Sequence, residues 1–138
     1  KEEASQQMHS KNNFLFQKAD RKQRNKVEKG MEIVSYIVEE LAAIDAPVTM
    51  MYGTMLHELR NGTGQCIIPR VDDKDFDIAV FERHFHVVLG MKDDIMEKFG
   101  WQMSDIKMDL LFLQIHPPQQ RLGEGFQIDV YGFKCDIR

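Results

Sequence analysis

The segment Asp-Phe-Asp-Ile-Ala-Val-Phe, residues 75–81, limits the fold of this chain more than any other part of its sequence. Side chains alternate between the two faces of a strand, so Asp75 and Asp77 share one face while Phe76 and Ile78 share the other. The apolar side chains indicate a core strand. Carboxylates two residues apart on a strand have Cα atoms ~6.5–7 Å apart, so they can converge on one hard cation.

Such carboxylates repel one another unless a metal ion or a basic group neutralises them. Magnesium takes few carboxylates and completes its shell with water and phosphate oxygens, which suits an open site at the end of a strand. The pattern Asp-x-Asp is common in proteins, however. Taken alone, it leaves two interpretations open, a metal site and a solvated acidic loop.

A strand, a Gly-Thr pair and a helical stretch precede the aspartates in the segment MMYGTMLHELR, residues 50–60. A helix N-terminus has free N–H groups and a dipole that favour an anion. Gly53 allows the backbone to approach a phosphate closely, and Thr54 can cap the helix or contact the phosphate. A plain turn with a helix cap is the alternative. A phosphate-binding turn followed by two aspartates on the next strand is rarer than either feature alone.

An apolar stripe predicts a helix that begins at Val27 and ends before Pro47, which disfavours the α conformation of the residue before it. The members of the stripe recur three or four residues apart, the spacing of one helix face. They are Val27, Met31, Val34, Val38 and Leu41, widened by Ile33, Ile37 and Ile44. Residues 1–26 are polar, and we expect a linker or stem with partial helix there.

Apolar runs separated by Gly and Pro predict the remaining elements. The predicted strands cover residues 48–53, 77–81, 106–115 and 126–133, and the predicted helices cover residues 54–60 and 82–99. This order predicts an α/β or α+β fold with a mixed sheet flanked by helices. A chain of 138 residues is long enough for one such domain with a buried core.

The composition excludes some classes of function. A net charge of −4 argues against a general nucleic-acid binder, whose affinity depends on basic residues. No apolar run approaches the ~20 residues of a membrane span. Cys66 and Cys135 are either a disulfide pair or two free thiols. Asn61-Gly62-Thr63 is an N-glycosylation sequon, which indicates a secretory compartment.

Three segments together resemble the LicD and fukutin branch of the nucleotidyltransferase superfamily. They are YGTMLHELRNG at 52–62, IIPRVDDKDFDIAVF at 67–81 and FQIDVYGF at 126–133. The resemblance implies a nucleotidyltransferase-like mixed sheet flanked by helices and a dependence on Mg²⁺ or Mn²⁺. It also implies transfer of a phospho-alditol or phosphocholine group from a CDP-linked donor to a glycan acceptor, carried by a glycoprotein or a glycolipid.

The resemblance also implies roles for individual residues. The metal-binding and catalytic carboxylates would be Asp75, Asp77 and Asp129, and the phosphate- or nucleotide-binding residues would be Gly53, Thr54 and Arg60. Asp109, in the segment IKMDLLFL, competes with Asp129 for the third carboxylate position. We prefer Asp129 because Tyr131 and Phe133 give it the aromatic continuation of the family pattern.

The chain departs from the family pattern in three places. His57-Glu58 replaces smaller residues, the interval from Pro69 to Asp77 is longer, and the chain stops soon after the third carboxylate. We therefore expect residues 27–138 to be a catalytic domain that is incomplete at its C-terminal end. A catalytically degenerate binding module with the same fold is the alternative. The sequon and the resemblance predict a location in the secretory pathway, in the Golgi lumen.

Overall fold

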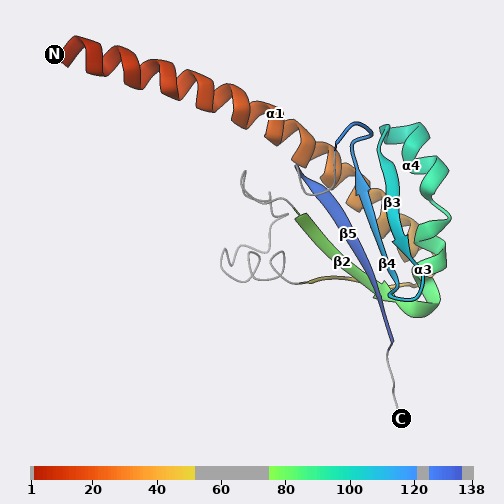
Figure 1. The fold of residues 1–138 in the computed structure, drawn as a ribbon. Coiled ribbons are helices and arrows are strands. Elements are labelled where there is room, and N and C mark those ends of the chain that lie inside the picture. The colour runs from red at the N-terminus through yellow and green to blue at the C-terminus, as the bar shows by residue number, and fades with distance from the viewer. Residues whose placement is uncertain (1, 52–74, 121–124, 135–138) are drawn as a thin grey trace.

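The computed structural model describes residues 2–51, 75–120 and 125–134, and of residues 2–20 it describes the helical backbone alone (Figure 1). The described elements, in chain order, are α1 (Glu2–Ala42), β1 (Val48–Met50), β2 (Asp75–Phe81), α3 (Glu82–Leu89), α4 (Lys92–Phe99), β3 (Gln102–Lys107), β4 (Phe112–His116) and β5 (Gln127–Phe133). None of the helices in these ranges combines the length and the hydropathy that a membrane crossing requires.

The strands form one mixed sheet in the order β1-β2-β5-β4-β3. Strands β2 and β5 pair in parallel, and the other neighbours pair antiparallel. A parallel pair needs a long crossover connection. Here α3, α4, β3 and β4 lie between the two parallel strands in the chain. The predicted mixed α+β architecture, a sheet with flanking helices, is confirmed.

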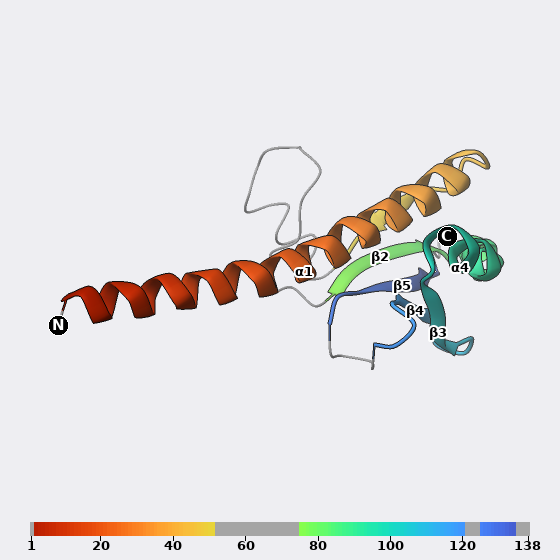
Figure 2. The same ribbon diagram turned by 90° about the horizontal axis from the view of Figure 1, so that it is seen from above.

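The core lies between the helices and one face of the sheet. Alternation along the strands turns Phe76, Ile78 and Val80 of β2 to the same face as Ile128 and Val130 of β5. These five side chains are at most 4% exposed. Figure 2 shows α1 running along the sheet on this side. The helix residues of the core include Ile33, Ile37, Leu41, Phe85, Val88 and Ile95.

Helix α1 ends before Pro47 as predicted, but it differs from the prediction in where it begins and in which side chains it buries. It is continuous from Glu2, where only partial helix was expected, and its first part extends away from the sheet (Figure 1). Residues 2–26 contain no Gly or Pro and many Glu, Gln and Lys residues, which favour a helix. The predicted apolar stripe was wrong at Val38 and Ile44, which are 40% and 49% exposed. The buried face instead passes through Gly30, which packs against the ring of Phe126.

The segment between β2 and β5 also differs from the prediction. The single helix expected over residues 82–99 is two helices, because Gly90 ends α3 and a new helix begins after Met91. The single strand expected over residues 106–115 is the hairpin β3–β4, with a turn at residues 108–111. Leu111 adopts the left-handed conformation there, with φ 51°. The apolar composition of this turn hid it from pattern analysis.

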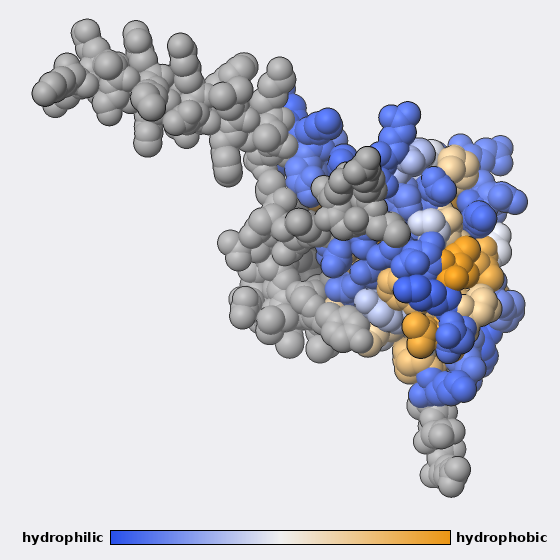
Figure 3. All heavy atoms as spheres, in the orientation of Figure 1, coloured by the Kyte–Doolittle hydropathy of each residue, from blue (hydrophilic) through white to orange (hydrophobic). Residues whose placement is uncertain are grey.

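The described surface is mainly hydrophilic in the view of Figure 3, with separate hydrophobic patches between charged residues. Met108 and Leu110, in the turn between β3 and β4, are 53% and 66% exposed. Met108 and Leu110 therefore lie outside the core, although their run in the sequence resembles a core strand.

Candidate functional site

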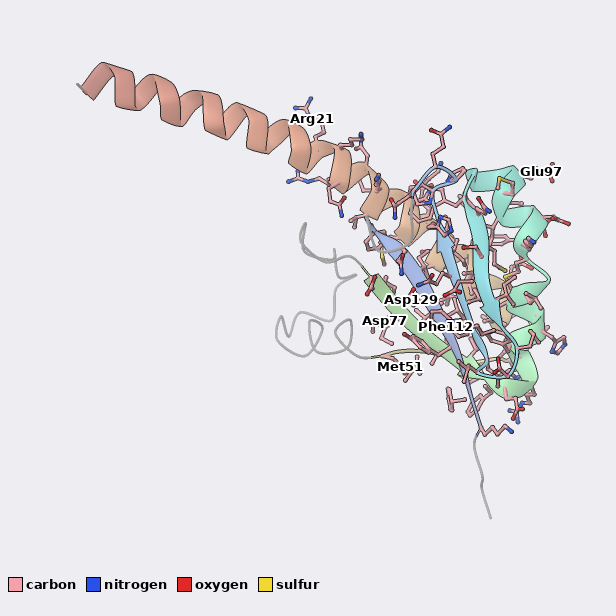
Figure 4. All side chains as sticks on the ribbon, in the orientation of Figure 1. Arg21, Met51, Asp77, Glu97, Phe112 and Asp129 are labelled. Carbon is pink, nitrogen blue, oxygen red and sulfur yellow. The ribbon has the colours of Figure 1, made fainter. Side chains whose placement is uncertain are left out.

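Asp77 and Asp129 lie opposite each other on the parallel strands β2 and β5. Figure 4 shows the two residues on adjacent strands of the sheet. Neighbouring strands are ~4.7–4.9 Å apart, so residues in register on the same face have adjacent side chains. Asp77 is 8% exposed and Asp129 is 6% exposed. Asp75 precedes the pair on the same face of β2, opposite Gln127, and is exposed.

The apolar residues of the two strands fix this arrangement. Ile78 and Val130, next to the aspartates, are both buried in the core on the helix side of the sheet. Because a shift by one residue would exchange the faces, the apolar set holds Asp77 and Asp129 on the opposite face. The position of the carboxylates is therefore a consequence of how the two strands bury their other side chains.

Two buried amides hold Asp129. Gln114, its partner in register on β4, donates a hydrogen bond from Nε2 to Oδ1 of Asp129 over 3.0 Å. Gln127 donates from Nε2 to the same oxygen, also over 3.0 Å. Both Gln side chains are at least nine-tenths buried. Hydrogen bonds to a carboxylate favour its ionised form, so the two amides orient Asp129 and support its negative charge.

Burial and charge repulsion shift the protonation of the pair. Burial, followed by the negative charges of Asp129 and Asp75, raises the pKa of Asp77 to about 7, and a hydrogen bond to Asp129 adds to the shift. Burial also raises the pKa of Asp129, but the hydrogen bonds from Gln114, Gln127 and Asp77 oppose that rise. The hydrogen bond raises one pKa and lowers the other, so Asp77 is its donor and Asp129 its ionised acceptor.

The pair fits a cation that brings most of its own ligands. Within residues 2–51, 75–120 and 125–134, no group of three or more His, Cys, Asp or Glu side chains is arranged to hold a metal ion. Magnesium, however, uses one or two carboxylates together with water and substrate phosphates. A divalent cation would also offset the burial and the charge repulsion that together raise the pKa of Asp77. The chemistry of Asp77 and Asp129 is therefore compatible with Mg²⁺ or Mn²⁺.

The competing carboxylate Asp109 does not lie beside Asp77. Asp109, the alternative to Asp129, is exposed in the turn between β3 and β4. That turn precedes Phe112, which pairs with Tyr131 farther along β5 than Asp129. The structure therefore brings Asp129, not Asp109, beside Asp77. The residues predicted to bind phosphate, together with the sequon and both cysteines, lie outside the described residues: Gly53, Thr54, Arg60, Asn61, Cys66 and Cys135.

Sequence analysis missed the two amides. Gln114 stands between Leu113 and Ile115 in β4, so a polar side chain within an apolar strand was the available signal. The Oε1 atom of Gln114 is buried and, within the described part of the chain, accepts no hydrogen bond. Ser104 of β3 is the partner of Gln114 in register, and its Oγ atom lies 2.6 Å from Nε2 of His116. The polar side chains thus continue from Asp77 across four neighbouring strands.

No protein-family model and no curated protein sequence matches this chain. Among solved structures, a terminal uridylyl transferase 4 from Trypanosoma brucei with bound GTP is similar, with 13% sequence identity and a TM-score of 0.43. The similarity covers 80% of this chain and 30% of the other, so this chain spans less than a third of the length of that structure. A similarity of this size supports no conclusion about activity or ligands.

Proposed function

We propose that this chain is a metal-dependent phosphotransferase domain with a nucleotidyltransferase-like fold. It would transfer a phospho-alditol or phosphocholine group from a CDP-linked donor to a hydroxyl group of a glycan. The observation that carries the proposal is the buried pair Asp77–Asp129, in register on parallel strands, with Asp75 on the same face. The resemblance of residues 52–81 and 126–133 to the LicD and fukutin branch supplies the donor and the acceptor.

Asp77 and Asp129 would hold Mg²⁺ or Mn²⁺, with Asp75 as a third carboxylate at the exposed side of the site. When bound, the ion neutralises charge on the donor phosphates. Gly53, Thr54 and Arg60 would bind these phosphates. This assignment comes from the sequence pattern, since the three residues lie outside the described ranges.

The protein groups at the site suit an in-line phosphoryl transfer. The acceptor oxygen forms a bond to phosphorus while the bond from phosphorus to the leaving phosphate oxygen breaks, and CMP departs. The acceptor hydroxyl must lose a proton. Asp129 would orient that hydroxyl and take the proton, since two amides hold it in position and support its negative charge.

One observation favours a second candidate, a domain that keeps the fold and binds a partner without catalysis. The described residues present two buried carboxylates beside each other but no cluster of three metal-ligating side chains. For such a domain, Asp77 and the amides of Gln114 and Gln127 would serve only to provide the buried Asp129 with hydrogen-bond donors.

Calorimetric titration of the full-length protein separates the two candidates. The transferase proposal predicts that CDP binds only with Mg²⁺ present, and that Asp77→Asn and Asp129→Asn each abolish this binding. Asp93→Asn, an exposed aspartate on α4, is the matched control and should bind as wild type does. Binding of CDP that is equal with and without metal would favour the binding module. A mass-spectrometric screen of CDP-linked donors would then identify the transferred group.

We also propose a location in the secretory pathway, in the Golgi lumen, which rests on the sequon at Asn61 and on the family resemblance. Glycosidase treatment of the native protein should increase its electrophoretic mobility. The Asn61→Gln variant should migrate as the treated protein does. Unchanged migration of the wild type would remove the support that the sequon gives.

A further inference from the structure

A pair of aromatic rings follows the carboxylates on the same face of the sheet. Phe112 of β4 and Tyr131 of β5 are partners in register, two residues beyond the partners Gln114 and Asp129. Their ring centroids are 5.1 Å apart and their planes are tilted by 54°. Both side chains are half-buried, whereas the core residues on the other face of these strands are fully buried.

The position of the rings relative to the carboxylates sets what they can contact. Two residues along a strand span ~6.5–7 Å. In a nucleotide, the ribose places the base at a similar distance from the phosphate. The helices that pack on the sheet bury its opposite face. Alternation along β4 and β5 places Phe112 and Tyr131 on the same face as Asp129. Because both rings are only half-buried, part of each can contact a molecule whose phosphates lie at the carboxylates.

A cation borders the ring pair. Lys107 is the partner of Phe112 on β3, and its Nζ lies 5.8 Å from the centre of the Phe112 ring. Its side chain is 49% exposed and pairs with Asp105 over 3.6 Å. An aromatic surface with a neighbouring cation is the combination that proteins use to bind nucleobases, because every base has a π-face and accepting atoms at its edge.

We infer that Phe112 and Tyr131 form the platform on which the base of the nucleotide stacks while its phosphates lie at Asp77 and Asp129. The inference rests on the proposed function, and it names the part of the donor that this half of the sheet recognises. Stacking tolerates different bases, so the platform contributes affinity for a nucleoside. The edge of the base would lie toward Lys107.

The experiment compares CDP with inorganic pyrophosphate, which has the phosphates but no base. Dissociation constants are measured by calorimetry on the full-length protein with saturating Mg²⁺. Phe112→Leu and Tyr131→Leu keep an apolar side chain but remove the ring. Each should weaken CDP binding by about five- to a hundredfold, the range of base–aromatic stacking. Neither should change the affinity for pyrophosphate, and Phe112→Tyr should restore CDP binding.

Phe133→Leu is the matched control. Phe133 lies two residues beyond Tyr131 on the same face of β5, is also half-buried, and forms a tilted pair with Phe81 at 4.7 Å between centroids. Its replacement removes the same atoms from a comparable packing environment farther from the carboxylates. We expect CDP binding by Phe133→Leu to equal that of wild type.

Several results would overturn the inference. Unchanged CDP affinity in Phe112→Leu and Tyr131→Leu would show that these rings only stabilise the sheet. An equal loss of CDP and pyrophosphate affinity, or an equal loss in Phe133→Leu, would indicate general weakening of the sheet. Retained CDP affinity with lost transfer to a glycan would assign the rings to the acceptor. If neither ligand binds to wild type, the proposed function fails and this inference fails with it.

Discussion

Asp77 and Asp129 face the same side of the sheet from directly opposite positions on two parallel strands, and both carboxyl groups are buried. Two carboxylates in such proximity cannot both ionise easily without a compensating charge. Within the described ranges, the amides of Gln114 and Gln127 donate to Asp129 and support its charge. Asp77, whose pKa is about 7, is therefore the group whose protonation responds to pH and to cations near neutral pH.

Without divalent cations, the stability of the protein should fall as pH rises from about 4 to about 7. The pKa of Asp77 is about 7 in the folded protein, against a usual value of 3.8. The folded state thus holds the proton of Asp77 more tightly than the unfolded state does. The protonated Asp77 contributes its full stabilisation below the unfolded pKa, and this stabilisation is lost as pH rises through the folded pKa. Thermal unfolding in EDTA at pH 5 and pH 8 measures the effect.

The Asp77→Asn variant is the control for this pH dependence. Asparagine does not titrate and can still donate a hydrogen bond to Asp129. Its melting temperature should change much less than that of wild type between pH 5 and pH 8, and at pH 8 it should exceed the wild-type value. Equal pH dependence in the two proteins would show that Asp77 does not hold the proton.

Replacement of Gly30 by Ala should destabilise the fold. A Cβ atom at this position of α1 would overlap the ring of Phe126, which is fully buried. Overpacking a core position of this kind costs typically ~1–3 kcal/mol. Denaturant unfolding measures the loss. Ala42→Gly, at the exposed end of the same helix, is a control that changes helix propensity without a core contact.

A double variant tests the cause of that loss. Combining Gly30→Ala with Phe126→Leu removes the ring that the new methyl group would meet. The two changes should therefore destabilise the protein by less than the sum of their separate effects, since they share one contact. Strict additivity would show that the Phe126 ring is not the obstacle.

The sequence predicted those strands and helices that have a periodic pattern of side chains within a short stretch of the chain. Alternating carboxylates and apolar residues predicted strands at 77–81 and 126–133, and both are present as β2 and β5. The turn at residues 108–111 was missed because exposed apolar residues there continue the apolar pattern of β4. The extension of α1 to Glu2 was missed because a polar helix has no apolar periodicity to detect.

The arrangement of the site could be predicted only in part. Each aspartate has a local signal, an acidic residue within an apolar strand. The register that brings Asp77 opposite Asp129 depends on the pairing of strands far apart in the chain. The contact of Gln114 with Asp129 has the same origin, since it requires β4 to pair with β5 at one register. A single sequence contains no direct measure of such pairings, so this partner of Asp129 became visible only in the fold.

Loss of either amide should weaken cation binding at neutral pH. The hydrogen bonds from Gln114 and Gln127 lower the pKa of Asp129 against the effect of burial. Gln114→Leu removes one bond, so the pKa of Asp129 should rise and the proton should compete better with Mg²⁺. The variant should also lose ~1–3 kcal/mol of stability, because it takes a hydrogen-bonding partner from a buried charge. Calorimetry at pH 7 and pH 8.5 measures Mg²⁺ affinity.

Gln127→Leu is the matched variant, because its amide donates to the same oxygen over the same distance. In both variants the loss of Mg²⁺ affinity should be smaller at the higher pH, because competition from protons weakens as pH rises. A loss of affinity that is equal at both pH values would indicate misplacement of Asp129. Unchanged affinity at pH 7 would show that the amides do not support its charge.

The response of thermal stability to ligands separates a metal site from a structural polar cluster. A ligand that binds only the folded state raises the melting temperature. Mg²⁺ with CDP should therefore raise the melting temperature of wild type at pH 7, and Asp77→Asn and Asp129→Asn should show little of this rise. Without ligand, Asp77→Asn should be as stable as wild type or more stable, because it removes a buried charge that two other carboxylates repel. A structural role predicts the reverse, a variant that is less stable without ligand and a wild type that does not respond to Mg²⁺. Differential scanning calorimetry of the three proteins, with Asp93→Asn as a control that should respond as wild type does, decides between these outcomes.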